Sequence, residues 1–209
     1  ATAASFCLKS RLLFSQSFDS IIRNGRVIDP SLNLDTIADV GVTDGRISAI
    51  EAVIDTTAAE EIEARDKIVL PGLLDIHGHY AQDDLGPHIC LSDGVTGWVD
   101  AGSAGADNVD EIIAVARSSP QDARILLNIG RKGVIPEGDT ADMSLANVEV
   151  AKSAIARNMD YIVGVKARMT EGVTANDLVV IRRAQEVASY FNLPPVSYTH
   201  LTLPTNCVV

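Results

Sequence analysis

The stretch Val69-Leu70-Pro71-Gly72-Leu73-Leu74-Asp75-Ile76-His77-Gly78-His79 carries most of the information about this chain. Pro71-Gly72 marks a turn, and the apolar run after it has the character of a strand. Side chains alternate between the two faces of a strand, so His77 and His79 point to the same side. Two imidazoles at this spacing can share one metal ion. The alternative is a pair of unrelated polar residues, because a lone His-x-His motif has little specificity.

The sequence before this stretch predicts a small β unit. From Ser20 to about Leu70, short β-branched runs flank Asn24-Gly25 and Asp44-Gly45. Both dipeptides are strong signals for two-residue hairpin turns. We therefore expect an antiparallel β unit in this region.

The sequence after Gly72 alternates between strand and helix patterns. Ser144 and Thr174 are expected to cap the second and third of the helices. A run of β/α units with short loops predicts a parallel sheet, closed or open, with a further strand beginning at Leu193. The expected strands are 73–76, 97–100, 124–129 and 161–166, and the expected helices are 108–118, 144–158 and 174–191.

Composition narrows the class of protein. The chain has 209 residues, with 17 Lys and Arg, 28 Asp and Glu, and a formal net charge of −11. It contains no basic cluster of the kind that binds nucleic acid, and no apolar run near the ~20 residues that span a bilayer. Cys7, Cys90 and Cys207 fit neither a disulfide framework nor a zinc finger, so we expect a cytoplasmic protein. Its expected partner is a small-molecule substrate, with no nucleic acid and no membrane, and a homo-oligomer is left open.

Polar residues at the ends of the predicted strands are candidates for a site, because barrel enzymes carry out chemistry there. Lys166 closes an apolar strand, and burial would lower its pKa and expose the neutral amine. The ordinary alternative is a lysine that extends to solvent. Ser103, Asn128 and Arg168 are candidates for substrate binding, with Arg168 as an anion clamp. We expect three other polar residues to be structural. His88 should lie at the surface or cap a helix, Asp100 should orient a loop, and Asp75 should support its strand end.

Several segments together resemble the amidohydrolase superfamily. Pro71–His79 resembles the signature of its first barrel strand, and Ile22–Pro30 with Asp44–Ile47 looks like its N-terminal β domain. Gly94–Gly105 and Val163–Arg168 are similar to the amidohydrolase/deacetylase branch, whose members are relatives of dihydroorotase. The resemblance covers about residues 18–195. It implies an α/β fold, a (β/α)8 TIM barrel of which this chain carries about the first four β/α units, preceded by a small β-sandwich unit.

The resemblance also implies a site with two divalent metal ions, which we expect to be zinc. His77 and His79 would bind the more buried ion, and Lys166, carboxylated by carbon dioxide, would bridge both. Two Lewis acids over one water generate a hydroxide that attacks a carbonyl. The family's second pair of histidines and its general acid/base Asp follow later strands, so no catalytic residue is assigned in this chain.

The function implied is that of a metal-dependent hydrolase cleaving an amide or ester of a small molecule, as deacetylases do. One alternative is a cyclic amidase such as dihydroorotase or hydantoinase, although these often carry an Arg where this chain has Ala81. The other alternative is a non-catalytic barrel homologue. The intact set of His77, His79 and Lys166 argues against it.

The two ends of the chain are expected to differ from the rest, which gives the division 1–18, 19–70, 71–195 and 196–209. Residues 1–18 are rich in Ser and Ala and have no acid, which favours upstream translated sequence or a truncated start, with a transit peptide second.

Residues 196–205 reverse-translate to GTC TCT TAT ACA CAT CTG ACG CTG CCG ACG, which resembles the transposase end and adapter of sequencing libraries. We expect the tail to be adapter-derived, the gene to continue beyond about Pro195, this fragment to be inactive, and His200 to be no metal ligand. The alternative is a genuine polar tail.

Overall fold

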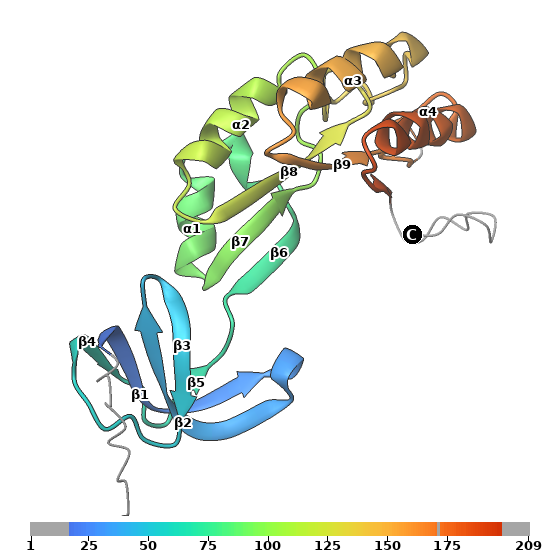
Figure 1. Cartoon of the computed structure of the whole chain (residues 1–209). Coiled ribbons are helices and arrows are strands. Elements are labelled where there is room, and N and C mark those ends of the chain that lie inside the picture. The colour runs from blue at the N-terminus through green and yellow to red at the C-terminus, as the bar shows by residue number, and fades with distance from the viewer. Residues whose placement is uncertain (1–16, 171, 198–209) are drawn as a thin grey trace, which may run out of the picture. The chain divides into compact units, whose positions relative to one another are not determined.

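The computed structural model describes residues 17–170 and 172–197. The chain divides into two compact units, Ala1–Pro71 and Gly72–Val209. Figure 1 shows strands throughout the first unit and alternating strands and helices in the second. Residues 1–16 and 198–209, including His200, lie outside the described residues.

The first unit contains a single five-stranded sheet with the order β3-β2-β1-β4, to which β5 adds by pairing with β1. β1 pairs antiparallel with β2, and β2 with β3, as expected. The expectation of a wholly antiparallel unit is wrong, because β4 and β5 both run parallel to β1. A β-sandwich is not confirmed. The elements are β1 (Phe18–Asp29), η1 (Pro30–Leu32), β2 (Leu34–Thr43), β3 (Arg46–Glu51), β4 (Ala58–Glu63) and β5 (Ile68–Val69).

The two predicted hairpin turns have different outcomes. Asp44 and Gly45, with φ of 52° and 68°, connect β2 to β3 as expected. Asn24 also has a positive φ, 59°, but it lies inside β1, where the pairing with β2 shifts register between Ile22 and Gly25. The Asn24 backbone N–H donates to Asp39 Oδ1 at 2.9 Å. This contact with β2 keeps the chain within the sheet, so the turn signal produces a β-bulge here.

The second unit is built on a parallel sheet with the strand order β10-β9-β8-β7-β6. Figure 1 shows this sheet curled, with α1, α2 and α3 following one another along one side of it. The result is a mixed α/β fold with a half-barrel sheet, in agreement with the predicted class. Its strands are β6 (Leu73–Gly78), β7 (Val95–Asp100), β8 (Asp122–Asn128), β9 (Ile162–Lys166) and β10 (Pro195–Val196). Its helices are η2 (Tyr80–Gln82), α1 (Gly86–Ser92), α2 (Val109–Ser118), η3 (Met143–Leu145), α3 (Val148–Arg157) and α4 (Asp177–Tyr190).

The N-caps predicted for two helices are wrong. Asn147 caps α3 by accepting a hydrogen bond from the Val150 N–H at 3.1 Å, and Asn176 caps α4 by accepting one from Val179 at 3.1 Å. Ser144 and Thr174 are therefore not the N-caps. An asparagine side chain nearer to each helix supplies the acceptor that the free N–H groups of the first turn need.

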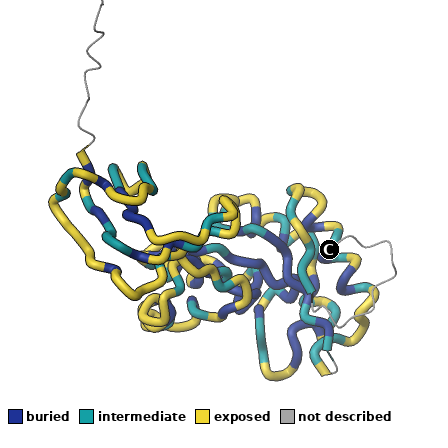
Figure 2. Tube along the Cα trace, turned by 90° about the horizontal axis from the view of Figure 1, so that it is seen from below, coloured by how far each residue is buried: buried dark blue, intermediate teal, exposed yellow. Residues whose placement is uncertain are grey.

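The apolar core of the second unit lies between its sheet and its helices. Trp98 and Ile125 from the strands are fully buried, as are Val109, Ile155 and Val187 from the helices. Figure 2 shows buried segments running through these elements and long exposed stretches in the first unit. No helix formed by residues 17–170 and 172–197 is long and apolar enough to cross a membrane.

Candidate functional site

The candidate site lies where the carboxyl ends of the parallel strands meet. Register brings these ends together, since Gly78 pairs with Asp100 and Asn128 pairs with Lys166. Each strand ends with or next to polar side chains: His77 and His79 at β6, Asp100 at β7, Asn128 at β8 and Lys166 at β9.

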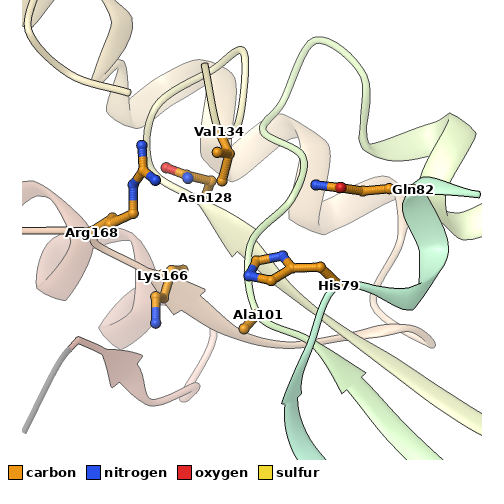
Figure 3. Close-up of a pocket in the computed structure, with 7 residues that line it drawn as sticks. All are labelled: His79, Gln82, Ala101, Asn128, Val134, Lys166 and Arg168. Atoms are coloured by element: carbon orange, nitrogen blue, oxygen red, sulfur yellow. The ribbon is translucent and has the colours of Figure 1, made fainter. Parts of the chain in front are cut away.

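A pocket of about 180 Å³ opens at this edge of the sheet. Figure 3 shows His79 and Lys166 on two sides of the space, with side chains from several elements around them. The pocket is lined by His79, Gln82, Ala101, Asn128, Val134, Lys166 and Arg168. Four of the six predicted site residues therefore line this pocket, and His77 and Ser103 do not.

The two histidines lie side by side. Their ring centroids are 6.0 Å apart, which is short enough for one zinc ion to contact both rings. Burial, followed by the charges of Lys166 and His79, lowers the pKa of His77. A lower pKa favours the neutral imidazole, which is the form that binds metal. Asp75 supports this strand end as expected, by accepting hydrogen bonds from the His77 N–H at 2.9 Å and the Tyr80 hydroxyl at 2.7 Å.

A hydrogen-bonded chain leads from His79, which is exposed, to Asp100, which is fully buried. His79 Nδ1 lies 2.6 Å from Ser103 Oγ, and Ser103 Oγ donates to Asp100 Oδ2 at 2.8 Å. Asp100 also accepts from the backbone N–H groups of Gly102 and Ser103, so it orients this loop as predicted. The link to His79 was not predicted from the sequence. The Asp-Ala-Gly-Ser spacing is typical of a turn closed by an Asp side chain and could have signalled the loop, but not its partner.

Lys166 is a buried lysine. Its exposed fraction is 2%, which excludes the alternative of a side chain that extends to solvent. Desolvation, followed by the charge of Arg168, lowers the pKa of Lys166 below its ordinary value. Gly102 packs against its aliphatic stem, since a Cβ added to Gly102 would lie 2.8 Å from Cβ and Cγ of Lys166. The lysine is thus held at the pocket in an environment that favours the neutral amine.

Arg168 and Asn128 share one buried partner. Asp139, which is fully buried, accepts from Arg168 Nη2 at 2.7 Å and from Asn128 Nδ2 at 2.9 Å. Asn128 also donates to the Gly102 carbonyl at 3.1 Å. Arg168 stays partly exposed and lines the pocket. Asp139 was not predicted from the sequence, because no motif in the loop that follows β8 marks it. The substrate-binding roles of Ser103, Asn128 and Arg168 stay predictions.

The residues present fit part of a metal site. Among residues 17–170 and 172–197, no group of three or more His, Cys, Asp and Glu side chains is placed to hold a metal ion. The donors at the strand ends are instead two imidazoles and a desolvated lysine, and of these His79 and Lys166 line the pocket whereas His77 does not. His88 is exposed on α1 and takes no part in this set.

Known proteins similar to this chain include hydrolases and a deaminase. No protein-family model matches the chain. A deacetylase from Enterococcus faecalis is 28% identical over 177 residues, covering 81% of this chain and 47% of the relative. A dihydroorotase from Solibacter usitatus is 27% identical over 186 residues, covering 85% of this chain and 41% of the relative. The chain therefore spans less than half the length of these curated relatives.

Among solved structures, an adenine deaminase superposes with a TM-score of 0.76 and 26% sequence identity. The match covers 87% of this chain and 50% of that chain.

Proposed function

Because the chain belongs to the amidohydrolase superfamily, we propose that the protein is a metal-dependent hydrolase that cleaves an amide or ester bond of a small molecule, as a deacetylase does. We further propose that residues 71–195 form about the first four β/α units of a (β/α)8 barrel. The observation that carries the proposal is the meeting of His77, His79 and the buried Lys166 at one edge of the parallel sheet.

We propose that His77, His79 and Lys166 help to hold two zinc ions, with Lys166 carboxylated by carbon dioxide. Only a neutral amine reacts with carbon dioxide, and the lowered pKa of Lys166 favours that form. The carbamate would supply the oxygen donors that no Asp or Glu cluster supplies among residues 17–170 and 172–197. Bound divalent ions supply Lewis acidity, which polarises a carbonyl and lowers the pKa of a water.

The other polar residues of the pocket are suited to binding and orienting the substrate. The ion pair with Asp139 fixes the Arg168 guanidinium while leaving part of it exposed. Such a group can bind a carboxylate or a carbonyl oxygen of the substrate. We assign no general acid or base to the described residues.

The second candidate function is that of a cyclic amidase, which the likeness to a dihydroorotase favours. Ala81 weighs against it. Where an Arg would be expected in many such enzymes, this chain has a small side chain that is 2% exposed and packed in the core. We therefore rank deacetylation first.

Metal analysis and activity assays on the full-length protein test the proposal. We expect two divalent ions per chain, with His77→Ala and His79→Ala each losing most of one. Lys166→Ala should lose at least about 100-fold in activity, more than the usual loss for a residue that only supports a ligand, and short-chain carboxylates should partly restore it. His88→Ala, an exposed histidine on α1, is the control and should change neither quantity. A protein that holds no metal and gains no activity from zinc or manganese would overturn the proposal.

A further inference from the structure

We propose that Ser103 and Asp100 act as positioning residues that fix the tautomer of His79, leaving its Nε2 as the nitrogen that binds metal. The consequence for metal rests on the proposed function. The tautomer itself is a property of the metal-free protein, so the two can be tested separately.

Asp100, the last residue of β7, is fully buried. Its carboxylate oxygens accept hydrogen bonds from two backbone N–H groups and one hydroxyl. Asp100 Oδ1 accepts from the N–H groups of Gly102 at 3.2 Å and Ser103 at 2.8 Å, and Oδ2 lies 2.8 Å from Ser103 Oγ. The Ser103 hydroxyl must therefore direct its single proton toward Asp100.

The direction of this bond determines the next one. With its proton on the Asp100 side, Ser103 Oγ can only accept from His79 Nδ1, which lies 2.6 Å away. In a neutral imidazole, one nitrogen carries the proton and the other carries a lone pair. Nδ1 of His79 therefore carries the proton, and Nε2 is left with the lone pair that a metal ion requires.

The loop that carries Ser103 is held on both sides, so this arrangement is pre-formed. The Ala101 N–H donates to the Gly78 carbonyl at 2.8 Å, which fixes the loop beside the residue that precedes His79. Asn128 Nδ2 donates to the Gly102 carbonyl at 3.1 Å from the next strand. Both partners of the Ser103 hydroxyl lie within the protein, and this side chain is 6% exposed. These contacts favour a positioning role for Ser103 over direct contact with substrate.

Three variants separate the possible roles. Ser103→Ala removes the acceptor for Nδ1–H, and we expect zinc affinity to fall about 10- to 100-fold, as is usual when the partner of a ligating histidine is lost. Ser103→Thr keeps the hydroxyl and should restore most of that affinity. Asp100→Asn should have the largest effect. Its carbonyl oxygen would keep the two backbone N–H donors, so its NH2 group would donate to Ser103 Oγ and reverse the bond to His79.

The measurements are made on the full-length protein. Metal-free protein labelled with 15N-histidine should show a protonated Nδ1 and an unprotonated Nε2 for His79, assigned by the loss of its signals in His79→Gln. Asp100→Asn should move the proton to Nε2. Zinc affinity is measured by competition with a chelator. The control is Ser92→Ala, an exposed serine on α1 whose hydroxyl donates to the Ile89 carbonyl at 2.7 Å.

The outcomes distinguish this inference from the proposed function. A wild-type protein that binds no zinc contradicts the proposed function, and the tautomer of His79 then decides the inference alone. A wild-type protein with the proton on Nε2 overturns the inference whatever its metal content. So does a Ser103→Ala variant whose zinc affinity lies within twofold of wild type. Loss of affinity in Ser103→Ala, restored in Ser103→Thr, supports it even if substrate affinity also changes.

Discussion

The two units of this chain hold their strands together in different ways. In the second unit, helices cover a parallel sheet and bury a large apolar cluster around Trp98 and Ile125. In the first unit, two small clusters form around Ile21 and Val27. Arg23 adds a polar centre there, through Asp39 Oδ2 at 3.0 Å, the Ile54 carbonyl at 2.7 Å and Glu61 Oε1 at 2.9 Å. The second unit therefore has one large apolar core, whereas the first unit has two small apolar clusters and a polar centre.

The largest effect should come from matched isoleucines. Ile125 in β8 and Ile21 in β1 are both fully buried. We expect Ile125→Ala to cost about 4 kcal/mol in the free energy of unfolding and Ile21→Ala about 2 kcal/mol, because a large cluster relaxes less around a cavity than a small one. Hydrogen exchange of the amides in β8 and β1 measures each loss within its own unit. Equal losses of stability in the two variants would contradict the difference between the two units.

A smaller effect should come from the polar centre of the first unit. Asp39→Asn weakens the partner of Arg23 and of two backbone N–H groups. We expect a loss of about 3 kcal/mol, as for other broken buried pairs, confined to the exchange of amides in β1 and β2. The control is Asp35→Asn, whose partner Arg26 is half exposed, and it should cost much less, because exposed ion pairs contribute little to stability. A loss at Asp39 no larger than at Asp35 would show that apolar contacts suffice in both units.

The same carboxylate gives the first unit a pH dependence. Burial alone would raise the pKa of Asp39, but the N–H groups of Asn24 and Ile54 and the guanidinium of Arg23 together hold it below its ordinary value of 3.8. Because the pKa is lower in the folded than in the unfolded state, the stabilisation is present above about pH 4 and is lost as pH falls through the folded pKa. Acid titration of Asp39→Asn should show a shallower loss of β1 protection than wild type below that pH.

The smallest effect concerns a helix start in the second unit. Asn176→Ala removes the acceptor for the Val179 N–H and should cost about 1 kcal/mol. Thr174→Ala removes only an exposed hydroxyl that accepts from the Asn176 N–H at 3.2 Å, and it should cost less. Thermal unfolding of both variants checks the order. The reverse order would identify Thr174 as the cap, as the local sequence predicts.

The parts of the fold that depend on local sequence could be predicted. The strand and helix alternation after Gly72 follows from periodicity, and β6 to β9 and α2 to α4 lie close to their expected positions. The turn at Asp44-Gly45 also formed as expected, whereas Asn24-Gly25 did not. Asp39, which accepts a hydrogen bond from the Asn24 N–H, is distant from it in sequence, so no local pattern could reveal this contact. The short helix α1 carries too little periodicity to define its limits.

In the candidate site too, some features could be predicted from the local sequence and others could not. The spacing of His77 and His79 and the apolar strand before Lys166 made them candidates, and the resemblance to the amidohydrolase superfamily supplied the predicted metal-binding roles. The Ser103 link to His79 and the Asp139 link to Arg168 depend on the paths of loops. Loop paths follow from tertiary contacts such as that between the Ala101 N–H and the Gly78 carbonyl, which composition and spacing do not encode.

Gly102 has a consequence for mutational tolerance. Its φ of 92° lies where L-residues are strained, and an added Cβ would meet the first two carbons of the Lys166 side chain, which cannot swing away as its tip can. A saturation library of this protein should therefore reject almost every substitution at position 102. Position 102 would thus be among the least tolerant positions of the library, although a glycine has no side chain and would not be chosen as a candidate for a chemical role.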